Sequence, residues 1–389
     1  MPEAAKTRAT SHELAHLDAA RAGAALLVLV HHVRNLMFVD YGSIGGHTNL
    51  LVTAVYALTS LGREAVMVFF VLSGFLIATT ISSAVGSGRW NLSSYALRRL
   101  TRLWVVLLPA LLVTLVLDRV AITWLPGGHL YVRPPEGEAV LSYSAASNDA
   151  PLLLLGNVAF LQEILVPPYG SNSPLWSLAY EFWYYVAFPL FFFSATGSSR
   201  WPKRAALAAI GLVVLVFAGK TIFLYFSVWL LGAAVALSYG RWGSAWRAPF
   251  WLAPAALFAL VGVLASARFI SFSFLRDFAI GLAFAVLLVG LRFRPPMRPL
   301  AMYGVGAAWL AGAAYTIYLV HFPAVLFFRA WLAPARLQPT LANSILGLVV
   351  LVSVLALALA FAQLTERRTD AIRGWAERRV VRRQRVEPP

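Results

Sequence analysis

The sequence has no cysteine among its 389 residues, and Asp, Glu, Lys and Arg together make up only 12% of it. The absence of cysteine excludes disulfides, thiolate metal sites, iron–sulfur clusters and a cysteine acyl-enzyme. The low charge and the 60% hydrophobic content exclude a disordered or fibrous chain. They also differ from a soluble domain, which is about 25% charged. A polytopic membrane protein is the class that remains.

Long unbroken apolar runs, rather than short alternating segments, predict membrane-spanning helices instead of a β-barrel. We therefore expect an all-α helical bundle of about ten transmembrane helices. Two further apolar stretches, 49–61 and 152–166, are too short to cross and are expected to be interfacial or re-entrant. The expected spans are 15–37, 65–82, 103–120, 172–193, 205–219, 221–239, 250–266, 274–291, 307–328 and 342–363.

The net charge of +16 is distributed in a way that indicates topology. If the N-terminus is inside, most Arg and Lys residues fall in the loops and termini on that side, as the positive-inside rule requires. We therefore expect both termini in the cytoplasm. Little charge is left over that would call for a nucleic-acid partner. The basic tail, 365–389, is expected to contact anionic membrane lipid.

Ionisable residues inside a span are costly, so each is a candidate for function. Arg21 and His32 are eleven residues apart in the first span, which places them on one helix face about 16 Å apart along the axis. Asp18 lies three residues before Arg21 and can pair with it. Glu181 lies among aromatic residues in the fourth span. A carboxylate beside a histidine fixes the imidazole tautomer, so Glu181 is a candidate partner for His32.

Three arginines, Arg98, Arg99 and Arg102, converge at the cytoplasmic end of the third span. Guanidinium groups at a helix N-terminus suit phosphates, although the same residues could serve only as topology markers. His321 lies in the ninth span, where a lone histidine is more often a packing residue. The histidines lack the spacing of metal ligands, so no metal is expected.

Five stretches of the sequence resemble, in the same order, the acyltransferase-3 family of integral membrane O-acyltransferases. They are LDAARAGAALLVLVHH, FFVLSGFLIA, RRLTR, SPLWSLAYEFWYYVAFP and YTIYLVHFP. Members of that family move an acyl group, usually acetyl, from acyl-CoA to a hydroxyl. Their acceptors are typically sugars of bacterial surface polysaccharides and sometimes antibiotics. The resemblance implies an acyltransferase-3-like membrane domain over 1–364 in the bacterial cytoplasmic (inner) membrane, without an appended esterase-like domain.

The resemblance also implies roles for individual residues. The family's motif of a basic residue, ten intervening positions and a histidine falls on Arg21 and His32. Its arginine motif is tighter than the spacing here, so that role is carried onto the arginine cluster as a whole. The roles implied are catalysis by His32 and Glu181, binding of acyl-CoA (acetyl-CoA) by Arg21, Arg98, Arg99 and Arg102, and binding of substrate by Trp176, Ser177, Tyr315 and His321.

Two other classes of function compete with the enzyme. Arg21, His32 and Glu181 could form the proton relay of a transporter or flippase, but the sequence shows no internal symmetry of the kind many transporters have. A sensory or scaffold protein would not require converging arginines. Within the enzyme hypothesis, we expect His32 to act as general base on the acceptor hydroxyl. An acyl-histidine remains an alternative, and an acyl-serine at Ser73 is disfavoured because no base is evident beside it.

Overall fold

The computed structural model describes residues 2–46, 48–132, 141, 143–238, 252–266, 272–292 and 301–386. Regular structure in these residues is helical, and they form no strand. The α-helices are α1 (Pro2–Met37), α2 (Leu50–Thr59), α3 (Gly62–Gly86), α4 (Leu92–Trp124), α5 (His129–Val132), α6 (Pro151–Val158), α7 (Trp176–Thr196), α8 (Trp201–Ala218), α9 (Lys220–Leu237), α10 (Leu252–Ser266), α11 (Ser273–Arg292), α12 (Ala301–Ala311), α13 (Ala314–Leu332), α14 (Leu341–Leu364) and α15 (Thr369–Val386).

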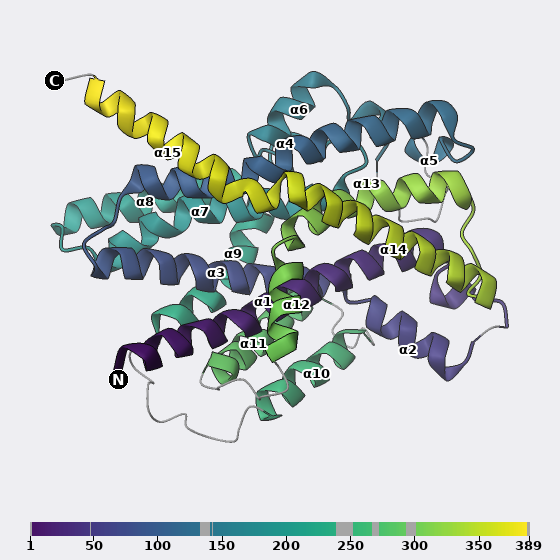
Figure 1. Cartoon of the computed structure of the whole chain (residues 1–389), viewed down its shortest axis with the longest axis horizontal. Coiled ribbons are helices and arrows are strands. Elements are labelled where there is room, and N and C mark those ends of the chain that lie inside the picture. The colour runs from purple at the N-terminus through teal and green to yellow at the C-terminus, as the bar shows by residue number, and fades with distance from the viewer. Residues whose placement is uncertain are drawn as a thin grey trace.

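The long helices run roughly side by side as a bundle, with the short α2 and α6 at its margins (Figure 1). Helix α1 packs against α3, α12 and α13, and α13 packs in addition against α4 and α14. Helix α15 contacts α4 and extends from the body of the bundle, toward the side on which the chain also begins. The two helices that carry candidate histidines, α1 and α13, are therefore direct neighbours.

Seven segments of the described chain are long and apolar enough to cross a membrane. They are Leu50–Gly86, Leu92–Trp124, Trp201–Ala218, Lys220–Leu237, Ser273–Leu291, Ala314–Leu332 and Leu341–Arg378. Helices α1 and α7 are long but less apolar, because His, Arg, Tyr and Trp replace aliphatic residues in them. Helix α10 has only 15 residues, and the expected ninth span is divided between α12 and α13. The helical membrane fold is confirmed, whereas the count of ten and the cytoplasmic termini remain predictions.

Glycine permits the close crossing of α3 and α9. A Cβ on Gly74 would overlap the carbonyl oxygen of Trp229, and a Cβ on Gly232 would overlap that of Val71. Small residues let helix backbones approach in a membrane, where dispersion contacts replace the hydrophobic effect between helices. The crossing also brings Trp229 Nε1 within 3.2 Å of Ser73 Oγ, to which it donates a hydrogen bond.

We predict that Gly232→Ala destabilises the protein by about 1–3 kcal/mol, because the added methyl group has no room against a backbone carbonyl. The measurement is the thermal unfolding midpoint in detergent. Gly23→Ala is the matched control, since nothing lies within 4 Å of its added Cβ in α1. Alanine has the higher helix propensity, so the control should hold or raise the midpoint. Equal midpoints for both variants would contradict the assigned crossing.

Candidate active site

A cavity of about 500 Å³ lies between α1, α3, α4, α7, α13 and the start of the C-terminal tail. Six arginines line it against three acidic residues, so its field favours an anionic ligand. The charged lining residues are Arg21, Arg98, Arg99, Arg102, Arg367, Arg373, Glu181, Glu366 and Asp370. All four arginines expected to bind acyl-CoA thus lie on one cavity, and Ser177 and Tyr315 line it too.

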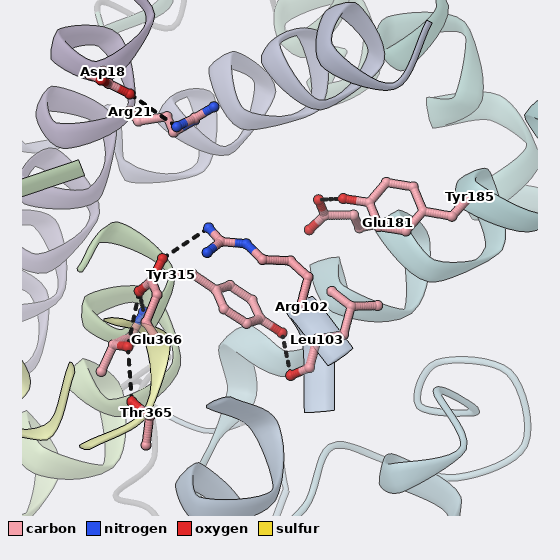
Figure 2. A network of polar contacts seen from close by, with 10 residues as sticks. Asp18, Arg21, Arg102, Leu103, Glu181, Tyr185, Tyr315, Thr365 and Glu366 are labelled. Atoms are coloured by element: carbon pink, nitrogen blue, oxygen red, sulfur yellow. Dashed lines mark hydrogen bonds and ion pairs between the residues drawn. The ribbon is translucent and has the colours of Figure 1, made fainter. Parts of the chain in front are cut away.

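Two of these arginines are held by neighbouring acids. Arg21 Nη1 donates to Asp18 Oδ1 at 3.1 Å, the pair expected from their spacing (Figure 2). Arg102 Nη2 lies 2.9 Å from Glu366 Oε1, and its guanidinium carbon lies 5.6 Å from the ring centre of Tyr315. These contacts hold the arginines in place at the cavity wall before any ligand binds.

Arg99 is held by aromatic rings instead. Its guanidinium carbon lies 5.7 Å from the ring centre of Tyr95 and 5.8 Å from that of Tyr185. Its buried Nε has no hydrogen-bond partner among the described residues. Arg99 therefore keeps donor capacity that the protein does not use, in a position that cation–π contacts fix.

Glu366 is a site residue that the sequence analysis missed. It lies in the 3-10 turn Glu366–Arg368 and is 4% exposed. Its Oε2 accepts hydrogen bonds from the backbone nitrogen of Thr316 at 2.8 Å and from Thr316 Oγ1 at 3.0 Å. Thr316 lies in the first turn of α13, where backbone N–H groups lack helical partners and the dipole favours an anion. The carboxylate of Glu366 therefore joins the tail, α4 and α13 around the cavity (Figure 2).

Glu181 lines the cavity but does not hold His32. Its carboxylate accepts a hydrogen bond from the hydroxyl of Tyr185 (Figure 2). It also accepts one from Ser73 Oγ at 3.2 Å. No hydrogen bond joins Glu181 to His32 in the part of the chain that the structure describes. The expectation that no base lies beside Ser73 is wrong, since the carboxylate of Glu181 is its neighbour. Because a carboxylate is a far weaker base than imidazole, the acyl-serine alternative still ranks below catalysis by histidine.

His32 is held by His321, a contact that the sequence did not indicate. His321 Nε2 lies 3.1 Å from His32 Nδ1. His32 Nδ1 also lies 3.0 Å from the Val28 carbonyl, and His321 Nδ1 lies 3.0 Å from the Ile317 carbonyl. A carbonyl only accepts, so each Nδ1 carries the proton and each neutral imidazole has its lone pair on Nε2. His321 Nε2 therefore accepts from His32, which leaves His32 Nε2 unprotonated and able to act as a base.

The histidine pair does not line the cavity but adjoins one of its lining residues. Tyr318 lines the cavity, and its ring centre lies 5.8 Å from that of His321. The hydroxyls of Tyr318 and Ser177 are 2.7 Å apart. Of the two residues spaced along α1, Arg21 therefore lines the cavity, whereas His32 lies off the cavity wall beside His321.

Trp176, also expected to bind substrate, lies apart from these groups. Its ring packs edge-to-face against Phe70 and Tyr180, and the guanidinium carbon of Arg63 lies 5.7 Å from it. It is not among the residues that line the cavity.

Comparison with known proteins identifies the family of the chain. The family model for the acyltransferase-3 family, described as an acyltransferase domain, matches residues 14–363. The chain belongs to the acyltransferase-3 family. "Acyltransferase MdmB" of Streptomyces mycarofaciens is 28% identical over 170 residues, which cover 43% of this chain and 36% of that protein. No solved structure matches.

The match spans only about a third of the length of that relative, so the family assignment rests on the family model. The matched range ends at residue 363, just before Glu366. The structure nevertheless places Glu366 within the wall of the cavity, so the site of this acyltransferase includes the start of its tail.

We predict that Glu366→Gln lowers stability by about 1–3 kcal/mol, because the amide cannot neutralise Arg102 and is a weaker cap for α13. The half-exposed guanidinium limits the effect. The thermal unfolding midpoint in detergent measures it. Glu377→Gln is the control: its half-exposed carboxylate lies 4.0 Å from Arg373 Nε, and the loss of this long contact should cost less than about 0.5 kcal/mol. An unchanged midpoint for Glu366→Gln would remove Glu366 from this role.

Proposed function

We propose that this acyltransferase moves an acyl group, most simply acetyl, from acyl-CoA to a hydroxyl of a carbohydrate acceptor in the bacterial cytoplasmic membrane. A surface polysaccharide or its lipid-linked precursor is the acceptor we propose. The observation that carries the proposal is one cavity lined by six arginines, with an oriented histidine pair next to its lining residue Tyr318.

The cavity supports acyl-CoA as donor. The phosphates of CoA need several cationic donors, and guanidinium groups bind phosphate through paired N–H groups. Arg98, Arg99 and Arg102 supply these groups from adjacent turns of α4. The pantetheine arm is long and thin, so it can extend past Arg21 toward Ser177 and Tyr318. In this arrangement the thioester approaches the histidine pair from the cavity side.

His32 acts as the general base in this proposal. Its Nε2 takes the proton of the acceptor hydroxyl while that oxygen attacks the thioester carbonyl carbon. The carbon–sulfur bond then breaks, and the proton passes from His32 to the CoA thiolate. Throughout, His321 Nε2 accepts a hydrogen bond from the Nδ1–H of His32. This hydrogen bond keeps His32 in the productive tautomer and stabilises its imidazolium form. Glu181 serves on the donor side, where it fixes Ser73 and Tyr185 around the acyl-CoA path.

A proton-coupled transporter or flippase is the alternative that the charged residues would allow. A relay needs protonatable groups in contact, and the described residues show no hydrogen bond between Glu181 and His32. The family assignment also supports transfer chemistry. A small hydroxylated metabolite such as an antibiotic is the alternative acceptor.

We predict that His32→Ala lowers acyl transfer by 10²–10⁴-fold while leaving acetyl-CoA binding intact, because it removes the base and not the arginines. Membranes containing the protein are incubated with radiolabelled acetyl-CoA, and label is followed into the lipid and polysaccharide fractions. His129→Ala, which removes an exposed histidine from α5, should transfer normally. Normal transfer by His32→Ala would refute the assignment.

We predict that Arg99→Ala raises the KM for acetyl-CoA by about tenfold or more with a smaller change in kcat, because a charge-assisted contact to the donor is lost. Initial rates at varied acetyl-CoA give both constants. Arg89→Ala is the matched control: Arg89 is an exposed arginine just before α4, outside the cavity, that donates to Ser87. A loss in kcat alone, or an equal rise in KM in the control, would argue against donor binding at Arg99.

A further inference from the structure

Pro323 leaves a backbone carbonyl of α13 without its helical partner. In an α-helix the carbonyl of Leu319 would accept from the N–H of residue 323, but proline has no N–H. Leu319 is fully buried, so water does not reach this oxygen. An unpartnered carbonyl inside a membrane protein costs several kcal/mol. Leu319 and Pro323 each lie two residues from His321, the residue that contacts His32.

Asn172 supplies the missing donor. This fully buried side chain lies just before the turn Ser173–Leu175 that leads into α7, and its Nδ2 donates to the Leu319 carbonyl at 2.8 Å. The same Nδ2 donates to Thr114 Oγ1 at 3.0 Å. Thr114 gives its own proton to the Ala110 carbonyl, so its oxygen is free to accept. Both partners of the amide therefore require a donor, which fixes its orientation.

The residues before Asn172 hold it firmly against α4. Ser171 donates from its backbone nitrogen at 2.7 Å and from Oγ at 2.6 Å to the carboxylate of Asp118. Gly170 has φ +55°, and a Cβ there would overlap that carboxylate. The amide of Asn172 is thus presented to α13 from a segment that α4 holds on its other side.

We propose that Asn172 is a positioning residue for the histidine pair: by occupying the carbonyl that Pro323 frees, it fixes the turn of α13 from which His321 meets His32. The role rests on the proposed catalytic function of His32. The segment that follows makes a second contact to the same turn of α13, because the hydroxyls of Ser177 and Tyr318 are 2.7 Å apart. Asn172 thus binds a backbone carbonyl of this turn, that of Leu319, and Ser177 binds a side chain of it, that of Tyr318.

A double-mutant cycle with Pro323 tests the inference. In Pro323→Ala the helix regains the N–H that can pair with the Leu319 carbonyl, so Asn172 should matter less. We expect Asn172→Ala to lower kcat for transfer from acetyl-CoA roughly 10- to 100-fold with KM unchanged, since a small misplacement of a base costs this much. Made in the Pro323→Ala background, the same change should cost less than about threefold.

Asn157→Ala is the matched control. Asn157 is also fully buried, and its Nδ2 donates to the carbonyls of Leu153 and Pro167. Its Oδ1 accepts from the backbone nitrogen of Tyr169, so it supports the loop before Asn172 without a hydrogen bond to the Leu319 carbonyl. Its effect on kcat should be the same in both backgrounds. An equal fold loss for Asn172→Ala with and without Pro323 would overturn the inference and leave the proposed function standing.

A second measurement does not need turnover. Diethyl pyrocarbonate modifies unprotonated imidazole, and mass spectrometry of the modified protein reports His32 and His321 separately. Asn172→Ala should raise their modification rates several-fold, because the pair opens, whereas Asn157→Ala should not. Unchanged rates in Asn172→Ala would also overturn the inference. If transfer instead proves independent of His32, the proposed function fails while the modification rates still decide the role of Asn172.

Discussion

The hydrogen bond between His32 and His321 depends on how α1 and α13 pack, and much of the site exists to hold that packing. Each imidazole gives its Nδ1 proton to a carbonyl of its own helix, so the tautomers are set before the helices meet. The packing of the two helices then determines whether the lone pair on His321 Nε2 lies within hydrogen-bonding distance of His32 Nδ1. A shift of one helix along the other would separate the rings without breaking either helix.

Helix α13 is held at two levels for this reason. Its N-terminus, which begins beside the cavity, is capped by the carboxylate of Glu366. Its turn before Pro323 is held by the amide of Asn172, which donates to the Leu319 carbonyl. Both partners satisfy backbone groups that the helix itself leaves open, and in a membrane interior no water would do so. The backbone N–H and C=O groups that these two side chains satisfy lie on α13, within a few residues of His321.

The sequence predicted the convergence of the arginines better than the contacts of the histidines. Eleven-residue spacing on a helix puts Arg21 and His32 on one face whatever the tertiary packing, and adjacent turns of α4 make its three arginines converge. Both expectations concern residues of one helix, and the structure places Arg21 and the three arginines of α4 on one cavity. The partner of His32 lies 289 positions away, so choosing His321 over Glu181 required the packing of α1 on α13. Periodicity within one helix carries no information about that packing.

The burial of Glu366 in the tail was likewise not predictable from the sequence pattern. An arginine-rich segment after the last apolar run suggests a lipid contact, and Glu366 reads as one acidic residue within it. Its burial follows from the position of α14, which brings the turn after it between α4 and α13. Arg102 then faces Glu366 on one side and the cavity on the other. Because one carboxylate neutralises a cavity arginine and caps the helix that carries His321, the arginine-lined cavity and the histidine pair are structurally coupled.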